Sequence, residues 1–402
     1  MLDASPTVSS EKTATELVPQ SLHKFLHVFQ KHKSEYMSTQ KPWNHAIDLK
    51  DTFKAKKGRL IPLSLQEQEE VSTFIDKQLH KGYIHPFKSP QIPPMFFISK
   101  KDGRKKMVQD YLYLNKHMVK NNYPLPLISQ LVDKLKGAKM FTKMDLWWRY
   151  KNVQIKEGNE WKAVFMCYHN SFEPLVMFFG LCNFPKIFQM MMNEIFTDIE
   201  DICVMYIDDL MIFTKSDSKE EYNMIVLEVL HHLKENDLFI KPEKYMLHAK
   251  EVVFLGMIMG KDSICRDDSK VKAILEWPKP KNIKEVRSFL GLTNFYCWFI
   301  SSYTQVAWLL NDLMKRDTLF VWGSAQQQVF NVLKEKFTTT PIFTYSNNDC
   351  KFCLECNSLD FAIGAVLSIF KDNKWHLVAY ASHFMSVEEQ NYLITIEMQR
   401  SQ

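Results

Sequence analysis

Three aspartates have the residue type and placement for binding divalent cations, and two of them are adjacent. Asp208 and Asp209 stand between the apolar runs 202–205 and 210–213, with no Lys or Arg beside them in the sequence. Two short apolar runs around a tight polar turn predict a β-hairpin with both carboxylates at its tip. Such a pair repels unless a multivalent cation lies between its members, and Mg²⁺ prefers oxygen ligands of this kind. A turn with two solvated acids is the competing interpretation, which the motif by itself does not exclude.

The third aspartate lies near the end of a predicted strand. Residues 140–146 alternate in character, and Asp145 stands near their C-terminal end. If this strand neighbours the hairpin, the three carboxylates can hold two Mg²⁺ ions about 3.5–4 Å apart. The chemistry that this pattern favours is nucleotidyl transfer, in which metals activate a 3′-hydroxyl and neutralise a triphosphate.

A basic segment precedes these strands. Residues 88–120 carry a strong excess of Lys and Arg over Asp, concentrated around Asp102-Gly103, a dipeptide typical of hairpin turns. Lys101 and Lys106 stand on either side of that turn. The segment is interpreted either as a solvated charged tip or as a clamp for phosphate groups.

Composition indicates a globular chain rather than a disordered one. Its 402 residues are 46% hydrophobic and 13% aromatic, enough for two or three packed domains, and the net charge of +5 is compatible with a polyanionic partner. The eight cysteines are scattered, as in reduced intracellular proteins. Residues 1–15 form a polar leader, and neither a signal peptide nor a membrane-spanning run is evident. We therefore expect no membrane association and an intracellular location, in a cytoplasmic particle or the nucleus.

Two local patterns bear on the elements around the aspartates. Ser64 and Glu67 form a capping box that predicts a helix ending at Gly82. Its predicted apolar face consists of Val71, Phe74, Ile75 and Leu79.

Three cysteines near the C-terminal end suggest a metal at first sight. Cys350, Cys353 and Cys356 are evenly spaced, but they lack a fourth ligand at a usual distance and fall on a predicted strand. Zinc binding is therefore disfavoured.

Several motifs occur together in a fixed order, and this order resembles the reverse transcriptase region of a gypsy-like long-terminal-repeat retrotransposon polyprotein. The resemblance runs from about residue 42 to residue 392. Its motifs are Lys100-Lys101-Asp102-Gly103, Asp110-Tyr111, Phe141-Thr142-Lys143-Met144-Asp145-Leu146, Phe179-Gly180-Leu181, Phe188-Gln189, Tyr206-Ile207-Asp208-Asp209, Phe254-Leu255-Gly256 and Ser288-Phe289-Leu290-Gly291-Leu292.

The resemblance implies an α+β fold, a right-hand polymerase with fingers, palm and thumb, followed by a partial RNase H-like α/β segment. The implied domains are an N-terminal leader at 1–42, fingers and palm at 43–256, a thumb at 257–325, and a connection with a truncated RNase H-like domain at 326–402.

The resemblance also implies the roles of single residues. The metal ligands and catalytic residues would be Asp145, Asp208 and Asp209. The nucleotide-binding residues would be Lys101, Lys106, Tyr150, Phe179, Gly180, Tyr206 and Ile207. The primer grip would be Phe254, Leu255 and Gly256.

The implied activity is RNA-directed DNA polymerisation with two Mg²⁺ ions, for which Mn²⁺ can substitute. The implied partners are an RNA template, a DNA or tRNA-type primer and deoxynucleoside triphosphates, and a dimer is one possible assembly.

Four positions depart from the family pattern. Leu112 and Arg149 replace the usual Arg and Gly near the polymerase site. Asn357 stands where the first RNase H carboxylate is expected, Glu397 only approximates the second, and the remaining acids would lie beyond residue 402. We therefore expect no RNase H activity. The alternative function is that of a decayed or domesticated remnant, which binds nucleic acid without synthesising DNA.

Overall fold

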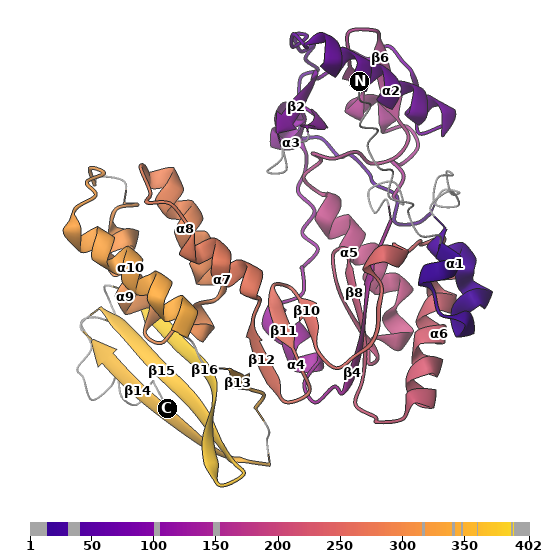
Figure 1. Cartoon of the computed structure of the whole chain (residues 1–402). Helices are drawn as coiled ribbons and strands as arrows, with labels where there is room; N and C mark the ends of the chain where they lie inside the picture. Colours follow the sequence, from indigo (N-terminus) through magenta and orange to yellow (C-terminus); the bar gives the residue numbers. More distant parts are fainter. Residues whose placement is uncertain are drawn as a thin grey trace, which may run out of the picture. The chain divides into compact units, whose positions relative to one another are not determined.

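The computed structural model describes residues 14–30, 41–99, 105–147, 153–315, 318–339, 342–346, 349–359, 361–386 and 389. The chain divides into two compact units, Met1–Leu135 with Met140–Ala249, and Lys136–Lys139 with Lys250–Gln402. Figure 1 shows their helices and strands. None of the helices within these described ranges is long and apolar enough to cross a membrane.

The first unit combines a four-stranded sheet with helices and two smaller strand groups. All strand pairs in it are antiparallel, in the orders β7-β8-β4-β9, β1-β6-β5 and β2-β3. Its elements are α1 (Ala14–Leu17), η1 (Gln20–Phe29), α2 (Leu65–His80), β1 (Ile84–Pro86), β2 (Met95–Ser99), β3 (Lys105–Gln109), α3 (Leu112–His117), α4 (Ile128–Lys134), β4 (Met140–Asp145), η3 (Glu160–Ala163), β5 (Phe165–Met166), β6 (Ser171–Pro174), α5 (Phe184–Ile195), η4 (Thr197–Ile199), β7 (Cys203–Tyr206), β8 (Asp209–Thr214), α6 (Lys219–Glu235), η5 (Pro242–Lys244) and β9 (Met246–Ala249).

The main core of this unit lies between the four-stranded sheet and helices α5 and α6. Side chains alternate between the two faces of a strand, so Met144 and Leu210, which are paired in register, share one face and are fully buried. Thr142 lies on that same face, and its hydroxyl accepts a hydrogen bond from Tyr222 of α6. Residues at the intervening positions, Asp145 among them, therefore point to the other face.

The N-terminal segment is part of this core. In η1 the side chains of Leu22, Phe25 and Val28 are buried, at the spacing of three that a 3₁₀-helix requires. The carbonyl of Val28 accepts a hydrogen bond of 2.9 Å from the amide of Ile240. The N-terminal segment is thus hydrogen-bonded to the residues that follow α6.

Among its described residues, the second unit has two further antiparallel sheets, four α-helices and one 3₁₀-helix. The sheets have the orders β10-β11-β12-β13 and β14-β15-β16. Its elements are β10 (Val252–Phe254), β11 (Met257–Met259), β12 (Ser263–Arg266), α7 (Asp268–Leu275), α8 (Ile283–Phe295), η6 (Cys297–Phe299), α9 (Tyr303–Asp312), α10 (Ser324–Thr339), β13 (Phe343–Thr344), β14 (Lys351–Leu359), β15 (Ala362–Lys371) and β16 (Lys374–Phe384).

The helix predicted from its capping box is present as α2. The capping box of Ser64 and Glu67 is present at the start of α2. The predicted face of that helix is wrong at one position, because Leu79 is 37% exposed while Val71 and Ile75 are buried. Leu79 lies in the last turn of α2.

The apolar side chains of the last sheet differ in burial. Ala362 is buried, but Phe352 and Leu354 are each 47% exposed. They lie on the face of β14 opposite to Asn357, whose register partner Gly364 faces Ser302 and Gln305 beside α9. Helix α9 therefore covers the Asn357 face of the sheet and leaves the other two side chains exposed.

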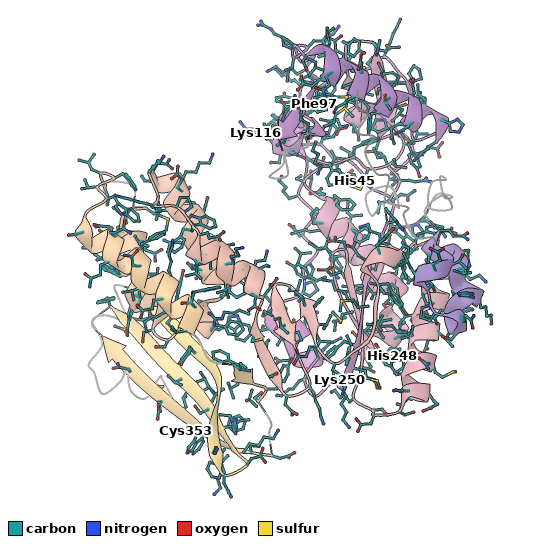
Figure 2. The ribbon with its side chains drawn as sticks, viewed as in Figure 1. His45, Phe97, Lys116, His248, Lys250 and Cys353 are labelled. Carbon is teal, nitrogen blue, oxygen red and sulfur yellow. The ribbon has the colours of Figure 1, made fainter. Side chains whose placement is uncertain are left out.

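The cysteine triplet does not converge. Cys353, labelled in Figure 2, and Cys356 lie three residues apart on β14, so their side chains point to opposite faces of the sheet. Cys353 and Cys356 therefore cannot both approach one ion from the same face of β14.

His45 is a buried titratable group in the first unit (Figure 2). Its main chain is bonded to Gln154 and Lys156, and its side chain is 0% exposed. Burial lowers the pKa of His45 to about 4, although the charge of Asp48 opposes the shift. The imidazole is therefore neutral in the folded protein at pH 7.

This burial predicts a loss of stability in mild acid. The folded pKa of about 4 lies below the ordinary 6.5, so the unfolded chain takes up the proton first and stability falls as the pH drops below 6.5. Between pH 7.5 and pH 5 we expect His45 to account for about 2 kcal/mol of unfolding free energy. Urea unfolding of wild type and His45→Leu at both pH values measures this, since the variant lacks the titrating group. An equal pH dependence of the two proteins would contradict the assignment.

Candidate functional site

The predicted hairpin is present. Strands β7 and β8 pair antiparallel, Tyr206 stands opposite Asp209, and Ile207 with Asp208 forms the two-residue turn. Ile207 has a φ of 55°, which is unusual for a β-branched residue. The first central position of such a turn is usually glycine when its φ is positive. The turn that carries Asp208 is therefore locally strained.

The register between β4 and β8 brings the third aspartate to the hairpin. Asp145 is the direct partner of Asp209 at the end of both strands. Because opposed residues share a face, both carboxylates point to the side of the sheet away from α5 and α6. Asp145 is 8% exposed, so its carboxylate is held mostly away from water.

Two lysines accompany these carboxylates, and the expectation that the acids lack basic partners is wrong. Lys241 Nζ lies 2.8 Å from Asp145 Oδ1, and Lys143 Nζ lies 3.3 Å from Asp209 Oδ1. The signal for Lys143 is present in the sequence: it precedes Asp145 by two residues on one strand and so shares its face. Lys241 comes from the chain after α6, which short-range patterns do not connect to the site.

The ammonium groups reduce the repulsion between acids at one strand end. Across the residues described, no three His, Cys, Asp or Glu side chains are already arranged as a metal cluster. The donor chemistry nevertheless fits Mg²⁺, which takes carboxylate oxygens and few protein ligands. Each lysine contacts the Oδ1 atom of its aspartate, so ions bound here would lie beside two ammonium groups.

Lys106 and Phe179, both expected at the nucleotide, are in contact with each other. Lys106 Nζ lies 3.2 Å from the centre of the Phe179 ring, a cation–π contact. Gly180 follows with a φ of 109°, and a Cβ there would meet Tyr111 at 3.3 Å. Glycine is therefore required at this position. Lys101 and Tyr150 lie outside the described residues.

A glutamine that sequence reasoning noted only as part of a motif supports the hairpin. Gln189 on α5 is fully buried, and its Oε1 accepts a hydrogen bond of 2.7 Å from the amide of Ile207. The partner is close in space but 18 residues away in the chain, so no local sequence signal could reveal it.

The residues expected to form a primer grip lie in the second unit. Phe254 is buried at the end of β10, and Leu255 and Gly256 have φ values of 50° and 80°. The carbonyl of Gly256 accepts a 3.0 Å hydrogen bond from Tyr296 Oη, and a Cβ on Gly256 would lie only 2.5 Å from that oxygen. This turn is thus fixed by an aromatic side chain of α8's C-terminal end.

The departures from the family pattern have different surroundings. Leu112 opens α3 and is 78% exposed, so it fills no core position. Asn357 lies on β14 opposite Gly364. Arg149 and Glu397 lie outside the described residues.

Comparison with known proteins agrees with this arrangement. Residues 98–259 match the family model "Reverse transcriptase (RNA-dependent DNA polymerase)", and residues 322–398 match "RNase H-like domain found in reverse transcriptase". The chain is 35% identical over 339 residues to the Transposon Tf2-3 polyprotein of Schizosaccharomyces pombe, and the Tf2-7 polyprotein is equally similar. The match covers 84% of this chain and 25% of the Tf2-3 polyprotein, so the chain spans about a quarter of such relatives.

Solved structures show the same fold. A foamy viral protease–reverse transcriptase in complex with RNA/DNA hybrid matches 98% of this chain and 53% of its own, with a TM-score of 0.77 and 18% identity. A foamy viral protease–reverse transcriptase in complex with dsDNA matches 97% and 84%, with a TM-score of 0.74.

The fold is therefore that of a right-hand polymerase, α+β in class and followed by an RNase H-like segment, as the sequence predicts. Within that class, residues 98–259 are similar to reverse transcriptase domains, and residues 322–398 are similar to the RNase H-like domain found in reverse transcriptases.

Proposed function

We propose that this chain is the RNA-directed DNA polymerase of a retrotransposon of the gypsy-like type, and that it extends a primer 3′-hydroxyl. One observation carries the proposal: β4 and β8 pair so that Asp145 faces Asp209 beside the turn residue Asp208, within the segment that matches reverse transcriptases. The resemblance to transposon polyproteins supports the source.

In this proposal Asp145, Asp208 and Asp209 hold the catalytic ions. Two Mg²⁺ ions, or Mn²⁺ in their place, would lower the pKa of the primer hydroxyl and neutralise the leaving pyrophosphate when bound. The protein's own contribution is to fix the carboxylates on paired strand ends. Short Asp side chains on a rigid sheet lose little freedom, so the geometry is set before the substrate arrives.

The nucleotide would lie against the cation–π pair. We assign Lys101 and Lys106 to the triphosphate, Tyr150 to the sugar, and Phe179, Gly180, Tyr206 and Ile207 to the pocket. Lys106 lies on the Phe179 ring and carries a charge that phosphate oxygens also attract. A triphosphate would therefore compete with the ring for the ammonium group.

The remaining assignments follow the same proposal. Fingers and palm occupy 43–256, the thumb 257–325, and the connection with the RNase H-like domain 326–402. Phe254, Leu255 and Gly256 position the primer. An RNA template and a DNA or tRNA-type primer are the proposed partners, supported by the foamy viral structures that hold RNA/DNA hybrid and dsDNA. An intracellular site of action and a dimer complete the proposal.

The alternative is a chain that binds nucleic acid without extending a primer. Asn357 in place of an expected carboxylate favours it for the RNase H-like part. The retained aspartates favour synthesis for the polymerase part. Primer extension on an RNA template separates the two functions, because binding alone gives no product.

The first prediction concerns the metal-binding carboxylates. Asp208→Asn should reduce primer extension at least about a thousandfold, because it removes a charge from the site where transition-state charge is stabilised. Asp198→Asn is the matched control, since that carboxylate pairs with His232 on the surface. Circular dichroism verifies that both variants fold. Primer extension by Asp208→Asn at the wild-type rate would contradict the assignment of Asp208 as a metal ligand.

The second prediction separates two neighbouring lysines. Lys106→Ala should raise the KM for deoxynucleoside triphosphate about tenfold and leave the Kd for template–primer within twofold, because its contact is with the nucleotide. Lys105→Ala removes the same charge, but that ammonium lies 2.7 Å from Glu67, whose pKa it helps lower to about 2. Little change in KM is expected for this control. Equal weakening of duplex binding by both variants would instead indicate contacts to backbone phosphates.

The third prediction concerns the RNase H-like segment. Cleavage of a hybrid requires several carboxylates around two metals, and Asn357 is neutral. The 402-residue chain should leave a labelled RNA–DNA hybrid intact in Mg²⁺ or Mn²⁺, and Asn357→Asp alone should not change this. Shortening of the RNA strand that disappears in Glu355→Gln would show that the segment is an active nuclease.

A further inference from the structure

The turn that carries Asp208 holds a conformation that its own sequence disfavours. Ile207 has a φ of 55°, and a β-branched side chain makes that conformation costly. Such a conformation persists only when its surroundings impose it. The question is which contacts hold the Ile207 backbone in place.

Gln189 is the contact that reaches both sides of Tyr206. Its Oε1 accepts the 2.7 Å hydrogen bond from the amide of Ile207, and its Nε2 donates to the carbonyl of Met205 at 3.3 Å. The side chain is 0% exposed, so water does not compete for these bonds. One amide thus fixes the backbone immediately before and after Tyr206.

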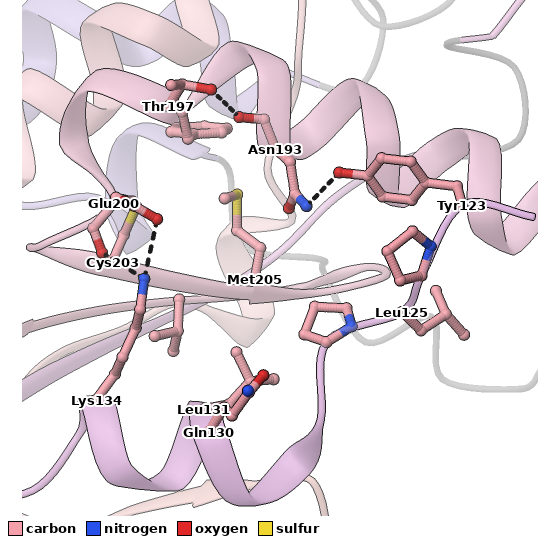
Figure 3. A pocket seen from close by; sticks show the side chains of 14 residues that line it. Tyr123, Leu125, Gln130, Leu131, Lys134, Asn193, Thr197, Glu200, Cys203 and Met205 are labelled. Atoms are coloured by element: carbon pink, nitrogen blue, oxygen red, sulfur yellow. Dashed lines mark hydrogen bonds and ion pairs between the residues drawn. The ribbon is translucent and has the colours of Figure 1, made fainter.

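Gln189 is itself oriented by Asn193, one helical turn further along α5. Gln189 Nε2 donates to Asn193 Oδ1 at 2.8 Å. Asn193 Nδ2 in turn donates to Tyr123 Oη at 2.7 Å, the bond that Figure 3 shows. The bonds have a single direction, from Ile207 to Gln189, Asn193 and Tyr123. A flipped Gln189 amide would place its NH₂ group against the Ile207 amide, and the Asn193 acceptor opposes that flip.

The outer end of this series of hydrogen bonds lies at a cavity. Tyr123 and Asn193 line a space of about 410 Å³ together with Leu125, Leu131 and Met205. Figure 3 shows the Tyr123 hydroxyl and the Asn193 amide meeting at its wall. Met205 thus lines the cavity with its side chain and accepts from Gln189 with its carbonyl.

We propose that Tyr123, Asn193 and Gln189 form a hydrogen-bond relay that positions the turn bearing Asp208 and Asp209 for metal binding. They are positioning residues, since none of them touches a reacting atom. The inference rests on the proposed function only for its effect on catalysis. Its effect on the carboxylates can be measured without substrate.

The experiment uses two relay variants and two matched controls. Gln189→Leu removes the contact to Ile207, and Tyr123→Phe removes the outermost acceptor. Gln91→Leu is the control for the first, because Gln91 is also buried and accepts a 2.7 Å bond from a backbone amide, that of Lys56. Tyr113→Phe is the control for the second, since that hydroxyl donates to the Lys54 carbonyl.

Mn²⁺ binding, measured from the electron paramagnetic resonance signal of the free ion, is the readout independent of activity. We expect about tenfold weaker binding for Gln189→Leu, about threefold for Tyr123→Phe, and less than twofold for either control. The double variant Gln189→Leu/Tyr123→Phe should bind Mn²⁺ as weakly as Gln189→Leu alone. Two substitutions that act through the same series of hydrogen bonds do not have additive effects. Primer extension should lose kcat in the same order, with the Kd for template–primer unchanged.

Several outcomes would overturn the relay. Mn²⁺ affinity within twofold of wild type in Gln189→Leu excludes it, as does a double variant whose effects multiply. If Gln189→Leu does not fold, the Mn²⁺ affinities of Tyr123→Phe and Tyr113→Phe are compared instead, and equal affinities exclude the relay. A wild-type chain that binds Mn²⁺ but extends no primer refutes the proposed function and leaves the relay testable, whereas a chain that binds no Mn²⁺ refutes both.

Discussion

The antiparallel pairing of β4 with β8 is the constraint on which the site depends. It sets Asp145 against Asp209, and a shift of one residue would turn one of the two carboxylates into the apolar core. Met144 and Leu210, fully buried on the opposite face, make that shift prohibitive. The same hydrophobic contacts that stabilise the sheet therefore fix the register of its carboxylates.

Gathering acids at one strand end has an electrostatic cost, which the chain offsets with its own cations. Lys143 and Lys241 contact the carboxylates of Asp209 and Asp145. The loop that carries Lys241 is also held by backbone hydrogen bonds. The Lys241 amide donates to the Asp145 carbonyl at 2.9 Å, and the Ile240 amide donates to the Val28 carbonyl. The N-terminal segment, remote in sequence, thus takes part in holding this loop beside the site.

The sequence predicts what is local and misses what is not. Ser64 with Glu67 identifies the start of α2 because a capping box involves residues three apart. The hairpin follows from its apolar runs. Lys241 and the bond from Ile207 to Gln189 join segments far apart in the chain, and the positive φ of Ile207 contradicts its residue preference. The exposure of Phe352 also escapes prediction, because apolar alternation does not tell which sheet face is covered.

The features that the sequence does not predict share a physical origin. A residue that breaks its own local preference requires compensation from elsewhere, and that compensation is tertiary. Ile207 is strained, and a buried amide from another element holds it. The acids repel, and lysines from two different segments contact them. Leu255 has a positive φ, and the Tyr296 hydroxyl donates to the carbonyl of the next residue, Gly256. Local disagreement between residue type and conformation therefore occurs at the hairpin of Asp208 and Asp209 and at Leu255 after β10. It also occurs at Asp237, His248 and Ser302, so backbone strain by itself does not single out the two proposed sites.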